Sequence, residues 1–302
     1  MPDGSLPPPD ARLPVEAAYA RCLALARSHY ENFPVASRLL PGRLRRPVAA
    51  IYAFARRADD LADEGDHAPE ERLARLDDME QALVECAIGQ PSEDFVFIAL
   101  GDAIRRHALP VRLFQDLLSA FRQDVEKRRY WDFDEVLDYC RRSANPVGRL
   151  LLHLMNRATP DNLECSDAIC TALQLVNFLQ DIRQDLLEND RIYIPETEME
   201  ASGVTETDLR EGRDTPALRA LLDEQISRAR ALLRRGAPLG HALPGRLGLE
   251  IRLVIAGGER VLERLEAAPP LSRLRLRRRD WMLTAWRALR PENVGRIRRE
   301  AP

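Results

Sequence analysis

Two segments of the sequence carry side chains whose types and spacing could do chemistry. Both hold carboxylate or amide groups at intervals of about one helical turn, namely Asp59, Asp60 and Asp63, and then Asn177, Asp181 and Asp185. Residues four positions apart lie about 40° apart on a helix, so each set would share one face. Carboxylates spaced in this way supply the hard oxygen ligands that Mg²⁺ combines with water and substrate phosphates.

Each segment also has a plain structural interpretation. Acidic groups at the C-terminal end of a helix oppose its dipole and repel one another, and they are often only solvated unless a cation such as Arg56 compensates them. In the second segment, Gln174 extends a polar stripe that runs beside Leu175, Phe178 and Leu179. This stripe is either the solvated face of an amphipathic helix or the wall of a polar cavity, and its apolar neighbours favour the cavity.

Two acidic helices that faced one another would meet a specific chemical need. They would hold several Mg²⁺ ions around a diphosphate, and the ions would stabilise the charge on that leaving group. Departure of the diphosphate would leave an allylic or cyclopropylcarbinyl cation, which an apolar cavity would protect from indiscriminate capture by water.

The composition indicates which elements must position these groups. Of the 302 residues, 45% are hydrophobic, 31% are charged and only 6% are aromatic, and there are only 15 Gly. This balance, dominated by Ala, Leu, Arg and Glu, favours helices over a β-sandwich, a barrel or a doubly wound sheet. It also excludes a disordered chain, a collagen and a disulfide scaffold. We therefore expect an all-α protein.

Apolar residues recur at three- and four-residue spacing almost throughout, and Pro and Gly mark the breaks. This pattern predicts helices over residues 15–28, 46–63, 69–87, 93–107, 111–127, 133–155, 166–188, 207–211, 216–237, 247–267 and 271–289. Pro146 should kink the helix in which it lies. Because no repeat and no long linker occurs, we expect a Pro-rich tail (residues 1–14), one all-α domain (residues 15–290) and a basic C-terminal tail (residues 291–302).

Nothing in the sequence predicts export or a membrane span. The N-terminus lacks an apolar signal segment, and the uncharged stretch at residues 168–180 is too short to cross a bilayer. We therefore expect a cytoplasmic protein.

Residues 271–302 hold 10 Arg and 3 acidic residues, a net charge of +7 in a chain of net charge −3. This end is either a solvated helix or a site for peripheral docking on the anionic inner face of the cytoplasmic membrane.

The two acidic segments resemble the paired aspartate-rich motifs of the squalene/phytoene synthase family. Asp59-x-x-x-Asp63 matches the first motif, and Asn177-x-x-x-Asp181-x-x-x-Asp185 matches the second. Further matching stretches follow the family's order, at His29–Phe33 with Leu40–Pro41, Tyr52 with Arg56, Arg129–Tyr130, Tyr139–Cys140 and Asn189–Pro195. The resemblance spans residues 17–265, so the chain is identified as a member of that family.

The resemblance implies a class I isoprenoid synthase (terpenoid synthase) fold, a single all-α domain with a central cavity between its helices. It implies Mg²⁺ ligands at Asp59, Asp60, Asp63, Asn177, Asp181 and Asp185. It implies substrate contacts at His29, Asn32, Phe33, Arg56, Gln174, Gln180, Arg191 and Tyr193, and catalytic roles for Tyr52, Tyr139 and Asn145. Local packing or loop ordering is the alternative role for His29, Tyr139, Arg191 and Tyr193.

Three departures from the condensing members of the family indicate a particular branch. This chain reads Ser143-Ala144-Asn145 where they usually read Val-Ala-Gly, and Pro146 follows. It has Gln180 where they usually have Arg, and Ala256-Gly257-Gly258 where they commonly carry a Tyr. These changes resemble the hydroxysqualene synthase branch of bacterial hopanoid biosynthesis.

That branch implies conversion of presqualene diphosphate and water to hydroxysqualene and diphosphate. Because water would quench the cation instead of hydride, no nicotinamide cofactor is expected. The first alternative is a head-to-head condensing enzyme that makes squalene or phytoene from farnesyl or geranylgeranyl diphosphate. The second is a non-catalytic relative that acts in assembly or lipid binding. The expected partner is presqualene diphosphate or another prenyl diphosphate, and no nucleic acid is expected.

Overall fold

A computed structural model describes residues 13–28, 40–63 and 65–272 together with Asp280, Thr284, Arg287 and Ala288. These residues form helices and contain no strand, which confirms the predicted all-α class. The helices are α1 (Val15–Ser28), α2 (Gly42–Asp63), α3 (Pro69–Ala87), α4 (Phe95–His107), α5 (Val111–Glu126), α6 (Phe133–Ser143), α7 (Asn145–Leu154), α8 (Pro160–Glu188), α9 (Glu196–Ser202), α10 (Glu206–Glu211), α11 (Pro216–Gly236), α12 (Leu239–Ala242) and α13 (Gly245–Glu266).

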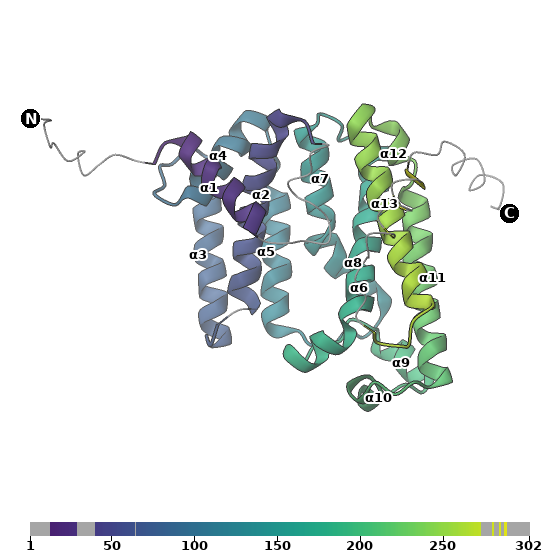
Figure 1. Ribbon diagram of the computed structural model, residues 1–302. Coiled ribbons are helices and arrows are strands. Elements are labelled where there is room, and N and C mark those ends of the chain that lie inside the picture. The colour runs from purple at the N-terminus through teal and green to yellow at the C-terminus, as the bar shows by residue number, and fades with distance from the viewer. Residues whose placement is uncertain are drawn as a thin grey trace, which may run out of the picture.

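Two large hydrophobic clusters and a smaller third one organise the helices that are drawn in Figure 1. The N-terminal core gathers buried side chains of α1 to α5 and of α7, with Phe54 and Phe114 fully buried at its centre. The C-terminal core gathers those of α6, α8, α11 and α13, and includes Tyr139 and Phe178. Helix α5 connects the two, because it packs against α2 and α3 on one side and against α6 and α7 on the other.

The predicted helix over residues 133–155 is wrong in one respect. It is two helices, α6 and α7, separated at Ala144, rather than one kinked helix. The physical reason is Pro146, which has no N–H to bond to the preceding turn and lies in the first turn of α7, where such a bond is not needed. This break places Asn145 at the beginning of α7.

Several other boundaries differ from the prediction. Helix α8 begins six residues earlier than expected, because the Thr159 side chain accepts a hydrogen bond from the Asn162 N–H and Pro160 suits the first helical position. Helices α9 and α12 were not predicted, and both are short. Most of the predicted helix over residues 271–289 lies outside the described residues, as do most of the Pro-rich tail and the basic tail over residues 291–302.

The described residues of the basic C-terminal segment pack against α13. Asp280 is completely buried, and its carboxylate lies 2.8 Å from Nη2 of Arg260 and 2.7 Å from Nη1 of Arg264. Thr284 is also buried, and the Ala288 carbonyl accepts a hydrogen bond from Arg252. This part of the segment is therefore not simply solvated. Among the described helices, none combines the length and the apolar character that a membrane crossing requires.

Candidate functional site

The acidic end of α2 is neutralised in part by an arginine on the same helix. Nη1 of Arg56 lies 3.3 Å from Oδ2 of Asp59, and Nη2 lies 2.7 Å from Oδ1 of Asp60. Tyr52 lies one turn before Arg56 and packs at the edge of the N-terminal core. On the opposite side, Ala58 and neighbouring small residues bury α2 in that core, which fixes the direction of the acidic face.

Arg191 brings the two acidic segments together. It lies just beyond α8, and its backbone N–H donates to the carbonyl of Asp185 at 3.1 Å. Its side chain is only 4% exposed, and Nη2 lies 3.2 Å from Oδ1 of Asp63 at the end of α2. The carboxyl ends of α2 and α8 therefore meet at one end of the molecule, as the two motifs predicted.

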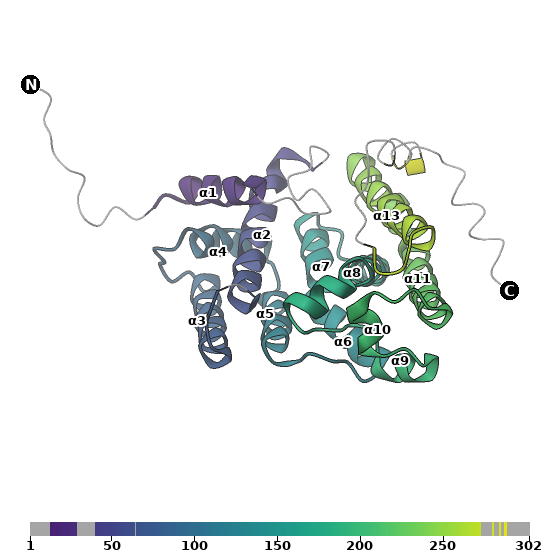
Figure 2. The ribbon, with the colours of Figure 1, turned by 60° about the horizontal axis from the view of Figure 1, so that its bottom comes forward.

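The loop that carries Arg191 is held by backbone hydrogen bonds to the segment that follows α5. Ile192 N–H donates to the Arg128 carbonyl at 3.0 Å, and Glu196 N–H donates to the Tyr130 carbonyl at 2.8 Å. Arg129 contacts the loop at Asp190, whose φ of 51° turns the chain out of α8. Two stretches that the sequence flagged separately, residues 129–130 and 189–195, thus form one unit. Helix α10 contacts α8, whereas α9 contacts α11 (Figure 2).

Asp124 is a buried member of the site that the sequence analysis missed. It is 4% exposed on α5, and it accepts a hydrogen bond from the Tyr139 hydroxyl at Oδ2 (2.8 Å) and a longer one from the Tyr193 hydroxyl at Oδ1 (3.4 Å). Its backbone carbonyl accepts from Nη2 of Arg191 at 2.6 Å. One signal was available, since Asp124 follows Phe121 by three positions and therefore lies on the apolar face of its helix.

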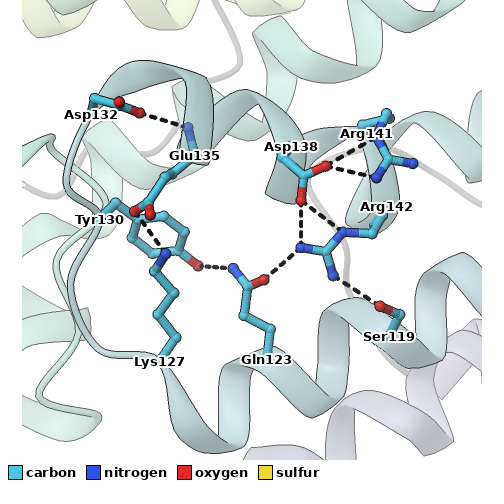
Figure 3. A network of polar contacts seen from close by, with 9 residues as sticks. All are labelled: Ser119, Gln123, Lys127, Tyr130, Asp132, Glu135, Asp138, Arg141 and Arg142. Carbon is cyan, nitrogen blue, oxygen red and sulfur yellow. Dashed lines mark hydrogen bonds and ion pairs between the residues drawn. The ribbon is translucent and has the colours of Figure 1, made fainter.

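The alignment of α5 with α6 explains why Asp124 faces Tyr139. Figure 3 shows a network of polar contacts that joins α5 to α6 and to the segment between them. In it, Arg142 donates to Gln123 and to Ser119, Gln123 donates to the Tyr130 hydroxyl, and Lys127 pairs with Glu135.

Two carboxyl groups of the site titrate far from their usual range. Burial raises the pKa of Asp124 to about 7, although Arg191 and the hydrogen bond from Tyr139 oppose the rise. Burial and the neighbouring carboxylate of Asp181 raise the pKa of Asp185 to about 7, and Arg191 again opposes. Asp63 contributes to both increases. The carboxylates of α2 and α8 are therefore within electrostatic reach of one another.

Aromatic rings cover one side of this charged group. The rings of Phe178 and Tyr193 are stacked with centroids 3.6 Å apart, and Tyr139 lies 5.5 Å from Tyr193. A pocket beside them is lined by apolar residues of α8 and by Asp185, Arg191 and Tyr193. Tyr139 itself is 4% exposed, so its hydroxyl lies inside the cluster.

The remaining predicted residues are placed as follows. Asn145 is buried at the junction of α7 with α8, where its Oδ1 accepts a hydrogen bond from Thr171 at 3.0 Å. Gln174, Asn177 and Gln180 lie on α8 and are partly exposed. The three predicted substrate contacts at the N-terminal side lie outside the described residues: His29, Asn32 and Phe33.

The donor set suits Mg²⁺. Within the described ranges, no three His, Cys, Asp or Glu side chains converge where a single ion could be held by the protein alone. Mg²⁺ needs only one or two protein carboxylates when water and phosphate oxygens complete its octahedron. Carboxylates from two facing helix ends provide that arrangement, and burial together with the neighbouring carboxylate of Asp181 raises the pKa of Asp185 among them.

Comparisons with known proteins agree with this geometry. The family model for squalene/phytoene synthase matches residues 26–283. The hydroxysqualene synthase of Rhodopseudomonas palustris is 37% identical over 268 residues, which cover 88% of this chain and 90% of that one. The phytoene synthase of Mycobacterium tuberculosis is 37% identical over 223 residues, covering 74% of this chain and 70% of that one.

A solved structure supports the same assignment. The crystal structure of squalene synthase HpnC from Alicyclobacillus acidocaldarius superposes with a TM-score of 0.78 at 38% identity, covering 84% of this chain and 96% of that chain. The predicted terpenoid synthase fold is therefore confirmed. On the family match and the extent of these similarities, the chain belongs to the squalene/phytoene synthase family.

Proposed function

We propose that this protein converts presqualene diphosphate and water to hydroxysqualene and diphosphate in a Mg²⁺-dependent reaction. The observation that carries the proposal is the contact of Arg191 with both acidic segments, because it brings the acidic ends of α2 and α8 together, where they could bind one diphosphate. The similarity to a hydroxysqualene synthase supports the choice of this reaction within the family.

The proposed metal ligands are the predicted acidic and amide groups: Asp59, Asp60 and Asp63 on α2, and Asn177, Asp181 and Asp185 on α8. Bound Mg²⁺ would supply Lewis-acid stabilisation of the departing diphosphate. Arg56 and Arg191 would balance the carboxylates and orient the diphosphate by directed N–H groups. The predicted contacts at Gln174, Gln180 and Tyr193 would complete the binding of the substrate.

The branch-specific residues would act on the cation after the diphosphate leaves. Asn145 is fixed by Thr171 at the break before α7, and we propose that its amide helps to position the incoming water. The aromatic faces of Tyr139, Phe178 and Tyr193 would stabilise positive charge nearby. Apolar side chains of α8 would exclude other water molecules.

Product identification tests this proposal directly. Purified protein is incubated with Mg²⁺ and either presqualene diphosphate or farnesyl diphosphate, and the products are identified by mass spectrometry. We expect hydroxysqualene and one equivalent of diphosphate from presqualene diphosphate, with loss of turnover in a chelator and recovery when Mg²⁺ is restored. Conversion of farnesyl diphosphate alone to a C30 product would contradict the proposal.

A head-to-head condensing enzyme is the second candidate. It is favoured by the phytoene synthase relative and by the structural neighbour described as a squalene synthase. The same incubations separate the two candidates, since only a condensing enzyme would consume farnesyl diphosphate on its own.

We also propose that the basic C-terminus docks on an anionic membrane surface, where a C30 substrate and product would reside. Because Asp280, Thr284 and Ala288 are buried, the informative truncation removes residues 289–302 and leaves these contacts intact. Sedimentation with anionic vesicles should weaken on truncation, whereas binding to neutral vesicles should not change. Equal sedimentation of both proteins would refute docking through these residues.

A further inference from the structure

We propose that Asp124 is a positioning residue of this site, which fixes the direction of the Tyr139 hydroxyl and holds Arg191 against Asp63. The inference rests on the proposed function, because it assigns a role within the same site. Asp124 would not contact the substrate. Its carboxyl group would act through two side chains on different elements, the Tyr139 hydroxyl and the guanidinium group of Arg191.

The first argument concerns the direction of a hydrogen bond. When Asp124 is ionised, its carboxylate can only accept, so the Tyr139 hydroxyl then directs its proton toward Oδ2 of Asp124, 2.8 Å away. What the Tyr139 oxygen can still offer is a lone pair. It is thereby prepared to accept a hydrogen bond from water rather than to donate one to the diphosphate. Replacing the carboxylate would remove this preference.

The second argument concerns the placement of Arg191. Nη1 of Arg191 donates to the Tyr193 hydroxyl at 3.2 Å and lies 3.8 Å from Oδ1 of Asp124. Nη2 contacts both the Asp124 carbonyl (2.6 Å) and Asp63 (3.2 Å). The guanidinium group is therefore oriented by α5 on one side while it serves α2 on the other. A carboxylate at position 124 favours this orientation because it is the buried counter-charge.

The chain provides a matched control in its N-terminal core. There the Tyr19 hydroxyl donates to Oδ2 of Asp102 at 2.9 Å, and Nε of Arg106 lies 2.8 Å from Oδ1 of the same residue. The three residue types are the same and the Tyr–Asp distances are alike, whereas the Arg–Asp carboxylate distance is 2.8 Å here and 3.8 Å at Asp124. None of the predicted site residues takes part in this N-terminal cluster. A purely structural tyrosine–aspartate hydrogen bond should behave as this one does.

A double-mutant cycle tests the proposal. Asp124→Asn, Tyr139→Phe and the double variant are compared with wild type in kcat and KM, using whichever of presqualene or farnesyl diphosphate the wild type turns over. Asp124→Asn should lower kcat by about tenfold or more with a smaller change in KM, as for other residues that orient ligands. In the Tyr139→Phe background, it should have much less effect, since the two residues act as a unit.

The control cycle uses Asp102→Asn and Tyr19→Phe, which should leave kcat unchanged. The proposal is overturned if Asp124→Asn keeps the wild-type kcat, or if the effects of Asp124→Asn and Tyr139→Phe simply multiply. Should Asp124→Asn fail to fold by circular dichroism, Asp124→Glu keeps the charge but displaces it, and a wild-type kcat in that variant would equally overturn the proposal. Failure of the proposed function is a separate result, namely a wild type that consumes farnesyl rather than presqualene diphosphate.

Discussion

Two Tyr–Asp–Arg clusters of this chain combine the same residue types but differ in how deeply their charged groups are buried. In the N-terminal core, Tyr19 is buried but the side chain of Arg106 is 69% exposed, so the ion pair with Asp102 faces solvent. In the C-terminal core, Asp124 and Arg191 are each 4% exposed, and Tyr139 is buried with them.

This difference in burial distinguishes an ordinary surface contact from the cluster at the candidate functional site. A solvent-facing ion pair is screened by water and salt, and contributes little to either stability or orientation. Burying a pair of charges costs free energy of desolvation, so a buried pair is weak evidence for stability. Its groups have no water to turn toward, however, and they therefore keep one geometry. The costly arrangement occurs where α2 and α8 meet, which is where a reaction would need fixed groups.

The largest effect on turnover should come from substitutions in the acidic ends of α2 and α8, which meet at the buried cluster of Asp124, Tyr139 and Arg191. Asp59→Ala and Asp181→Ala should each reduce diphosphate release by about 10³-fold or more, because each removes part of the proposed Mg²⁺ stabilisation of the leaving group. Asp102→Ala is the control and should leave turnover unchanged. Wild-type release in Asp59→Ala and Asp181→Ala would refute the metal assignment and favour a non-catalytic role.

Removing the arginine should distinguish the clusters by stability. Arg191→Met leaves the buried carboxylate of Asp124 without its cation and should lower the free energy of unfolding by about 3–5 kcal/mol. Arg106→Met should have little effect, because solvent takes the place of the exposed cation. Urea unfolding of both variants measures the difference, and equal losses would mean that burial does not set the contribution of the arginine.

The free energy of unfolding should depend on pH through the buried cluster, because Asp124 changes its protonation state there. The folded pKa of Asp124, about 7, lies above its ordinary value of 3.8, so between these limits the folded state holds a proton that the unfolded state has released. Stability from this group is therefore present below about pH 4 and is lost as the pH rises through 7. Arg191, Tyr139, Tyr193 and Asp63 all face this carboxyl group and set the size of the effect.

Urea unfolding in a chelator, measured from pH 5 to pH 8, checks this sign. The difference between wild type and Asp124→Asn should change across that interval, with wild type losing more stability as the pH rises. Parallel curves for the two proteins would show that Asp124 has the same pKa in the folded and unfolded states.

The smallest effect should be the loss of one hydroxyl group. Tyr19→Phe and Tyr139→Phe each remove a hydrogen bond to a carboxylate, and each should cost about 1–2 kcal/mol of unfolding free energy. Only Tyr139→Phe should reduce turnover. Equal losses of stability with a loss of turnover only in Tyr139→Phe would support a functional difference between the two clusters. A fall in turnover in both variants would contradict that difference.

Local spacing predicted the parts of the site that lie within one helix. The one-turn intervals of Asp59 with Asp63 and of Asp181 with Asp185 placed each pair on one face, and Arg56 was expected beside the first pair. The resemblance to the family added Arg191 and Tyr193, which follow α8 in a loop. The all-helical fold and the family membership that the resemblance implied are confirmed.

Long-range partners explain what was missed. Asp124 meets Tyr139 and Arg191 through a turn and a loop, and no motif at position 124 announces either partner. The break at Ala144 was underestimated because a kink and a new helix have the same local signal, Pro146. Helices α9 and α12 are too short for apolar periodicity to reveal them.

The contact of Asp63 with Arg191 also has a consequence for the order of folding. These residues are 128 positions apart in sequence, whereas helices that follow one another in the chain, such as α1 with α2 and α3 with α4, also contact one another. Closing so long a loop is entropically costly, so we expect local helical pairs to form early and this contact to form late. A newly made chain would therefore be unable to hold a reactive diphosphate until both halves had docked, and the appearance of activity during refolding would mark the final step of assembly.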